Sequence, residues 1–188
     1  MNRTDSVNWQ PYSPARFEGK LCYHLCTTDS ELPLRMVIEG YTEPNYETMT
    51  YNYYWCCNQI GVRAAVNDGL SHILFVTRYK GKNRQYAERC FIVGYYEIGW
   101  TDTVGNRTVI RPKKLSFTRI EDAYEITPER WKRINPDGKS YQPESLRYAT
   151  QRLKGSLFEE IVTHLDAHDA TADYLFEVAR LKAETNPF

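Results

Sequence analysis

Three hydrophobic runs separated by polar segments form the clearest pattern along the chain. The runs "SHILFVTRY" (71–79), "RCFIVGYYEIGW" (89–100) and "VIRPKKLSFTRI" (109–120) are rich in β-branched and aromatic residues, and polar segments with turn residues lie between them. This pattern predicts an antiparallel meander of three strands. Gly94 lies inside the middle run and predicts a β-bulge or a tight bend, because glycine inside a strand often marks one.

Shorter β-prone runs precede the meander. The segments "KLCYHLCTT" (20–28), "LRMVIEGYT" (34–42) and "TYNYYWCC" (50–57) have the composition of strands. The segment "NQIGVRAAVNDG" (58–69) predicts a short helix or loop that ends at its Asn-Asp-Gly turn. Residues 1–16 are rich in Ser, Asn and Pro and predict a flexible N-terminal arm.

The pattern becomes helical in the last third of the chain. Apolar residues recur at steps of three and four from Pro143 onward, which predicts a helix, and "AHDATAD" (167–173) separates it from a second helix through residues 175–179. The apolar positions of the first helix are Leu146, Ala149, Leu153, Leu157, Ile161 and Leu165. The chain therefore divides into the arm (1–16), a β-barrel-like domain (17–125), and a connector with two C-terminal helices that pack on the same domain (126–188). We expect an α+β fold, a small antiparallel β-barrel flanked by helices.

Length and composition exclude several classes of protein. A chain of 188 residues with 41% hydrophobic residues can bury one sizeable core. The N-terminus lacks the apolar core of a signal peptide, and no window approaches the about 18–20 apolar residues of a membrane span. Five cysteines at irregular spacings argue against a disulfide scaffold. We expect a cytoplasmic protein that does not bind membranes.

The net charge of zero conceals a basic segment. Residues 78–119 carry ten Lys and Arg against three Asp and Glu, and both flanking segments are acidic overall. A basic segment inside an otherwise acidic chain favours an acidic partner such as nucleic acid. Alternatively, Lys and Arg serve only the solubility of the loops between strands.

The aromatic run at 51–55 has two interpretations. In a strand, Tyr51, Tyr53 and Trp55 share one face, and Asn52 and Tyr54 lie on the other. Three large rings on one face can stack on planar bases, at roughly 1–3 kcal/mol per base. The same face can equally pack in the core of a barrel.

Candidate metal and catalytic residues are few. Cys22, His24 and Cys26 alternate along one predicted strand, and with Cys56 or Cys57 they would complete a Cys3His zinc set. Their spacing differs from the usual C-x2–4-C, and buried free cysteines are common.

A second histidine pattern lies on the predicted C-terminal helix. His164 and His168 have the four-residue spacing at which two imidazoles can hold one metal, or they lie at a solvated helix end. Phosphate-binding glycine loops and G-x-S-x-G are missing from the sequence, which favours binding over catalysis. We therefore assign no catalytic residue, metal or cofactor.

The order of motifs from Trp55 to Ile98 resembles the PUA-like group of small β-barrels, in particular its EVE and YTH-like domains. In those domains a tryptophan-bearing strand leads through a short helical segment and a glycine–acid turn into two strands. Here Asp68–Gly69 takes the place of the turn in reversed order, and "LFV" (74–76) and "IVGYYEI" (92–98) take the places of the strands. The segment "CCNQIGVRAA" (56–65) is also similar to part of the nucleotide-modification-associated domains.

The resemblance implies a nucleic-acid-binding module, because domains of this group generally bind RNA or DNA and the EVE and YTH-like members accept a modified base in an aromatic pocket. Taking a base out of a duplex stack costs a few kcal/mol, which aromatic walls would offset. The expected walls are Tyr51, Tyr53, Tyr54, Trp55 and Trp100, the expected edge or phosphate contacts are Asn58 and Arg63, and the expected backbone contacts are Arg78, Lys80, Lys82, Arg84, Lys113 and Lys114.

Two alternatives to a nucleic-acid reader stay open at this point. One is a protein-interaction or regulatory domain with a tyrosine-rich surface, whose affinity would hardly depend on salt. The other is a metal-dependent enzyme that processes nucleic acid at a site not visible in the sequence.

Overall fold

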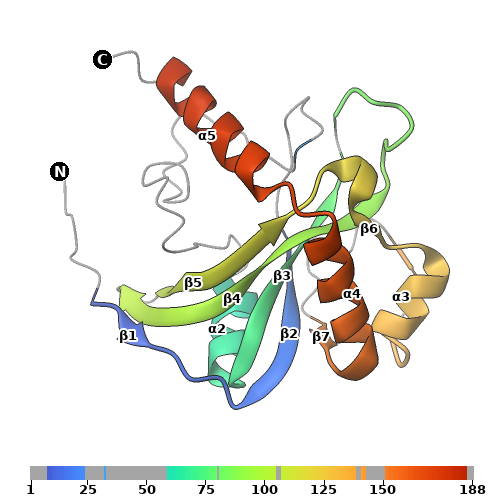
Figure 1. Cartoon of the computed structure of the whole chain (residues 1–188). Coiled ribbons are helices and arrows are strands. Elements are labelled where there is room, and N and C mark those ends of the chain that lie inside the picture. The colour runs from blue at the N-terminus through green and yellow to red at the C-terminus, as the bar shows by residue number, and fades with distance from the viewer. Residues whose placement is uncertain are drawn as a thin grey trace.

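The protein has a mixed α+β fold, built from one seven-stranded sheet and four α-helices in the part of the chain that the structure describes (Figure 1). The computed structural model describes residues 8–23, 32, 59–79, 81–104, 107–138, 141–142 and 151–185. The strands are β1 (Gln10–Pro11), β2 (Arg16–Tyr23), β3 (Leu70–Arg78), β4 (Cys90–Val104), β5 (Arg107–Phe117), β6 (Tyr124–Glu125) and β7 (Arg152–Leu153). The helices are α2 (Gln59–Asn67), the 3-10 helix η1 (Ile120–Asp122), α3 (Pro128–Ile134), α4 (Gly155–Ala167) and α5 (Thr171–Thr185).

The predicted meander is confirmed by β3, β4 and β5, which pair antiparallel in sequence order. The bulge predicted at Gly94 is also confirmed, because Phe75 pairs with Gly94 and Val76 pairs with Ile92, which leaves one extra residue on β4. A side chain at Gly94 would place its Cβ 2.4 Å from the carbonyl oxygen of Ser116. The strands therefore approach at this bulge as only glycine permits.

The sheet is mixed, in contrast to the purely antiparallel arrangement expected from the sequence. The strand order is β1-β4-β3-β2-β7, with β5 and β6 also paired to β4, and these pairings describe an open sheet. β2 and β3 run parallel, because the connection through α2 returns the chain to the end of the sheet at which β2 began. The short helix predicted before the Asn-Asp-Gly turn is confirmed as α2, and Gly69 of that turn has a φ of 68°.

Both faces of the sheet are covered by helices. On one face, side chains of α2 and the first turn of α5 join a core cluster around Phe75 and Phe117. On the other face, α3 and α4 supply Trp131, Phe158 and Ile161 to a second cluster (Figure 1). Among the described helices, none is long and apolar enough to cross a membrane.

The C-terminal prediction is partly wrong. The helix begins at Gly155, not near Pro143, and Arg152–Leu153 form strand β7 against β2. Buried Leu153 fits the helical spacing, but its burial comes from pairing with β2 in the sheet. Residues 143–150 lie outside the described part of the chain. The predicted break and the second helix are confirmed, since α4 ends at Ala167 and α5 begins at Thr171.

The predicted N-terminal arm is bound to the sheet from residue 8 onward. β1 pairs with β4, the amide of Asn8 donates to Asp102, and the hydroxyl of Tyr12 donates to the carbonyl of Leu70 at 2.9 Å. Residues 1–7 and the strands predicted at 34–42 and 50–57 lie outside the described residues.

Candidate binding surface beside helix α4

Two neighbouring rows of residues cross the four central strands on the face that carries α4. The first row is in register from β2 to β5, and we call it the covered row. Its members are Leu21, Leu74, Tyr95 and Ser116. The second row lies two residues away on each strand, and we call it the polar row. Its members are Gly19, His72, Glu97 and Lys114.

Helix α4 lies along the covered row. Its buried residues Phe158, Ile161 and Leu165 pack in the same core cluster as Leu21 and Leu74, and the hydroxyl of Ser116 donates to the carbonyl of Leu165 at 3.1 Å. The helix comes so close to β2 that a Cβ at Gly19 would lie 2.1 Å from Leu74 and 3.0 Å from Phe158. The glycine therefore permits α4 to sit directly beside the polar row.

A bulge in β2 includes Phe17, at one end of the polar row. The register passes from the Arg16–Leu70 pair to the Gly19–His72 pair, so two residues of β2, Phe17 and Glu18, oppose Ser71 alone. At this bulge the Ser71 hydroxyl forms hydrogen bonds with the main chain of Glu18. It accepts from the Glu18 amide at 3.1 Å and donates to the Glu18 carbonyl at 3.0 Å. Bulges of this kind often re-aim side chains at functional sites.

Phe17 is a large apolar side chain that the fold leaves 63% exposed. Its ring packs edge-to-face on His72 and on Phe158, with both centroid distances 5.3 Å. Edge-to-face contacts add roughly 0.5–1.5 kcal/mol beyond area burial, so they fix the position of the ring without burying it. The ring of Phe17 is therefore fixed in position by its neighbours and accessible to solvent.

Two further bulges bring a pair of lysines to the other end of the row. Glu97 pairs with Lys114 but Ile98 pairs with Pro112, which leaves Lys113 as the extra residue of β5. Adjacent residues of a regular strand point to opposite faces, but here Lys113 binds Glu97 at 2.8 Å in the polar row. The compensating bulge on β4 falls at Gly99, where a Cβ would lie 2.8 Å from the Cβ of Lys113.

His72 lies under the ring of Phe17 and is only 2% exposed. Its Nδ1 is 2.7 Å from the Ser71 oxygen. Since the Ser71 hydroxyl already donates to Glu18, this contact is best satisfied by an Nδ1–H that donates to Ser71. Burial lowers the pKa of His72 to about 4, against the opposing effect of Glu97, and the nearby lysines lower it further. The ring is therefore neutral at physiological pH.

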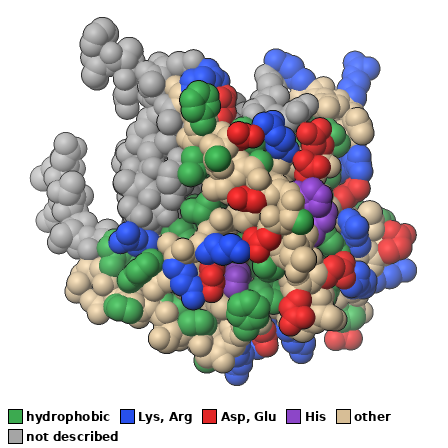
Figure 2. Space-filling view, in the orientation of Figure 1, with side chains coloured by type: hydrophobic (Ala, Val, Ile, Leu, Met, Phe, Trp, Pro, Cys, Tyr) green, Lys and Arg blue, Asp and Glu red, His purple; other side chains and the backbone are tan. Residues whose placement is uncertain are grey.

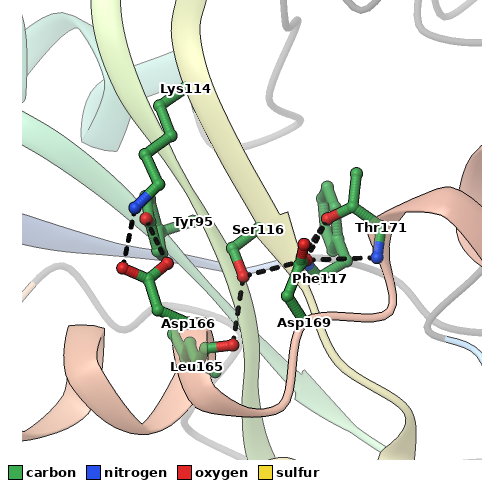
Figure 3. Close-up of polar contacts among 8 residues, drawn as sticks. All are labelled: Tyr95, Lys114, Ser116, Phe117, Leu165, Asp166, Asp169 and Thr171. Atoms are coloured by element: carbon green, nitrogen blue, oxygen red, sulfur yellow. Dashed lines mark hydrogen bonds and ion pairs between the residues drawn. The ribbon is translucent and has the colours of Figure 1, made fainter.

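Tyr95, Lys114 and Asp166 form a hydrogen-bonded cluster where α4 reaches β5 (Figure 3). The Tyr95 hydroxyl donates to Asp166 Oδ1 at 2.6 Å, Lys114 Nζ donates to Oδ2 at 2.7 Å, and Nζ lies 5.6 Å from the centre of the Tyr95 ring. Burial, and then the hydrogen bond to Asp166, raises the pKa of Tyr95 to about 12. The hydrogen bond to Asp166 is also the main reason that the pKa of Lys114 is raised.

The pKa values of these three groups lie away from neutrality. General acids and bases work best with pKa values near the operating pH. The pKa of His72 is displaced far below neutrality, and those of Tyr95 and Lys114 are displaced above it. Tyr95 is fully buried and His72 is only 2% exposed, so Lys114 is the group of these three that the surface presents to solvent. Figure 2 shows this face, where basic and acidic side chains gather beside a histidine with hydrophobic side chains around them.

The structure neutralises much of the basic segment. Among the described side chains, five of its basic residues form ion pairs, two of them with acids from the C-terminal third of the chain. The pairs are Arg78–Glu88, Arg89–Glu125, Lys113–Glu97, Lys114–Asp166 and Arg119–Asp173. The charge asymmetry along the sequence therefore does not become a uniformly basic surface.

Among the described residues that were predicted to bind nucleic acid, only Lys113 and Lys114 reach the polar row. Arg63 is exposed on α2, and Lys82 and Arg84 are exposed in the turn between β3 and β4. Trp100 is half-buried. The guanidinium of Arg111 lies 4.8 Å from its ring centre. The predicted residues outside the described part of the chain are Tyr51, Tyr53, Tyr54, Trp55, Asn58 and Lys80.

Four residues of the surface were missed by sequence reasoning: Phe17, His72, Tyr95 and Asp166. His72 lies in a run whose pattern indicates a buried strand, and its one distinguishing signal is that it interrupts that run with a polar ring. Phe17 falls at the predicted border between the arm and the barrel. Nothing in the local pattern indicates that Asp166 meets Tyr95 across the fold.

Only one residue of the alternative zinc set, Cys22, lies in the described part of the chain. Cys22 is buried in β2, and His24, Cys26, Cys56 and Cys57 lie outside the described residues. In the described part, no group of three or more His, Cys, Asp and Glu side chains is placed to hold a metal ion.

Comparisons of the chain with protein-family models, with curated proteins and with solved structures found no match.

Proposed function

We propose that this protein is a nucleic-acid-binding domain that holds a single-stranded segment along the polar row. The observation that carries the proposal is the exposed ring of Phe17, packed on buried His72 at one end of a row whose other end carries Lys113 and Lys114. A planar base and its neighbouring phosphates need this combination of one accessible ring and nearby cations.

Phe17 is the proposed stacking platform. A base that stacks on an aromatic side chain gains roughly 1–3 kcal/mol, whatever its identity. The edge-to-face contacts with His72 and Phe158 hold the ring before a ligand arrives. Little side-chain entropy is then lost on binding, which favours affinity.

Lys113 and Lys114 are the proposed phosphate contacts. Their side chains are 46% and 53% exposed, although each already pairs with a carboxylate. A phosphate must therefore compete with Glu97 and Asp166, so we expect moderate affinity. With two phosphates engaged, the logarithm of the binding constant should fall with the logarithm of salt by roughly 0.7 per phosphate.

The finer fold assignment, a PUA-like domain that accepts a modified base, is part of the same proposal. It is supported by the order of a short helix, a turn at Asp68–Gly69 and the β3–β4–β5 meander. A modified base would be recognised at the Phe17 end, where the aromatic side chains Phe17, His72 and Phe158 meet.

Fluorescence anisotropy with short labelled oligonucleotides tests the proposal. The panel contains single-stranded RNA, single-stranded DNA and duplex DNA, each with and without methylated or hydroxymethylated bases, at two salt concentrations. The variant Phe17→Ala should weaken binding by about 5- to 150-fold, which corresponds to one lost stack. Its matched control is Phe176→Ala, because Phe176 is 73% exposed on α5 and away from the row.

A second pair of variants tests the lysines. The double variant Lys113→Gln, Lys114→Gln should weaken binding and reduce its salt dependence. The control Lys132→Gln, at an exposed position of α3, should leave both the affinity and the salt dependence unchanged. If no probe binds at low salt, or if Phe17→Ala binds as the wild type does, the proposal is wrong. Phe17 would then be an apolar contact for a protein partner, and that interaction should hardly depend on salt.

A further inference from the structure

The histidine pair of α4 has a geometry that the proposed binding surface does not use. His164 and His168 lie four residues apart at the C-terminal end of the helix, and their ring centres are 4.6 Å apart with a tilt of 36°. A Zn²⁺ ion 2.0–2.1 Å from one nitrogen of each ring requires ring centres about 5 Å apart. The separation of the ring centres is therefore close to the one that a bridging ion requires.

Hydrogen bonds to backbone carbonyls assign one donating nitrogen to each ring. His164 Nε2 lies 2.8 Å from the carbonyl oxygen of Asp122, and His168 Nδ1 lies 2.8 Å from the carbonyl oxygen of His164. A carbonyl can only accept, so each of these ring nitrogens carries the proton. This leaves Nδ1 of His164 and Nε2 of His168 with free lone pairs. Histidines that bind metals almost always donate their other N–H in this way.

The surroundings favour a cation. The pair lies at the C-terminal end of α4, where the helix dipole is negative. The ring of His164 also packs edge-to-face on Tyr124, with centroids 5.6 Å apart, so its orientation is fixed from a second side. His168 is exposed, which gives an ion and its water ligands access from solvent.

We propose that His164 and His168 form a site for one divalent transition-metal ion of the imidazole-preferring group, such as Zn²⁺ or Ni²⁺. Nδ1 of His164 and Nε2 of His168 are the protein ligands, and water completes the coordination. Two imidazoles suit these ions, and Mg²⁺ prefers oxygen ligands, so the site should reject Mg²⁺.

Long-range proton–nitrogen NMR of the imidazoles tests the site without interference from cysteine thiols. The metal-free protein should show the Nε2–H tautomer for His164 and the Nδ1–H tautomer for His168. Titration with ZnCl₂ should shift both signals together and saturate at one ion, and MgCl₂ should shift neither. His164→Gln and His168→Gln should each weaken Zn²⁺ binding at least tenfold at this site, and Glu159→Gln, an exposed position on the same helix, should not.

His168→Gln is the decisive variant, because His168 is exposed and its replacement leaves the contact between His164 and Tyr124 in place. Opposite tautomers, or histidine signals that do not move with millimolar ZnCl₂, would overturn the site. The same holds if Zn²⁺ shifts the His164 signal equally in wild type and in His168→Gln.

Discussion

The covered row and the polar row lie side by side on the same four strands, but only the polar row contains charged side chains. Leu21 and Leu74 in the covered row are fully buried under α4. In the polar row, Glu97 on β4 and Lys114 on β5 both bind charged partners. Helix α4 lies along the covered row and contacts the polar row through Phe158, which packs against His72, and through Asp166, which binds Lys114.

The comparison shows how a polar surface can lie directly beside the core of a small domain. Register shifts in β2, β4 and β5 flank the polar row, and the bulge beside Gly94 lies next to the covered row. The shift in β5 brings Lys113 to Glu97 on a face that strict alternation would not give it. The core fixes the backbone, and the bulges beside it choose which side chains face solvent.

The largest expected effect separates the two rows by stability. Phe158→Ala removes a fully buried ring from the covered side and should lower the free energy of unfolding by about 3–5 kcal/mol. Phe17→Ala removes a mostly exposed ring and should cost less than about 1 kcal/mol. Urea unfolding of both variants measures the difference. Equal losses would mean that Phe17 is a core residue and that the two rows do not differ as described.

The next effect is the pH dependence that His72 gives to stability. The unfolded ring gains a proton below its ordinary pKa of 6.5, but the folded ring stays neutral down to about 4. The unfolded state therefore binds more protons in this window, and stability is lost as pH falls from 6.5 to about 4. The total loss is roughly 3 kcal/mol at about 1.4 kcal/mol per pH unit.

His72→Gln is the control for this pH dependence, because it keeps a polar side chain but cannot titrate. Urea unfolding at a series of pH values should show a smaller loss for the variant between pH 6.5 and 4. Glu97, Asp166, Lys113 and Lys114 remain in both proteins, so their effects cancel in the difference. Parallel curves for the two proteins would show that His72 is not a buried neutral ring.

The smallest expected effect concerns the cluster that closes the polar row. Asp166→Asn removes the charge that accepts from Tyr95 and Lys114, so the pKa of Tyr95 should fall below about 12 but stay above 10, since burial is the larger cause. The loss of stability should be under about 1 kcal/mol, because both partners of the ion pair are partly exposed. Ultraviolet titration, with Tyr95→Phe to identify the Tyr95 signal, measures the shift.

Local patterns predicted the parts of this fold that depend on local sequence. The meander, the bulge at Gly94, helix α2 and the break before α5 all follow from periodicity or from turn residues. The helix start near Pro143 was wrong because Leu153 fits a helical spacing while belonging to a strand paired with β2. The parallel pairing of β2 and β3 was missed because the partners are far apart in the sequence.

The candidate surface could not be predicted because it depends on register. A shift of one residue in the register of β5 determines whether Lys113 faces Glu97 or lies on the opposite side of the sheet. No local sequence pattern indicates where that shift occurs. The basic segment did indicate Lys113 and Lys114. The sequence did not indicate that Asp166 and Asp173, which lie far along the chain, form ion pairs with this segment.

The bulge at Phe17 and Glu18 has a consequence for how the chain folds. Its two neighbours are Ser71 and Arg152, and the latter pairs with Glu18 from 134 residues away. The entropy cost of closing so long a loop is met before the contacts between its ends form. We therefore expect strand β2 to pair late in folding. During synthesis, β2 leaves the ribosome before β3 and β7, the two strands with which it pairs. The candidate surface at Phe17 therefore forms only after both of these strands have been made.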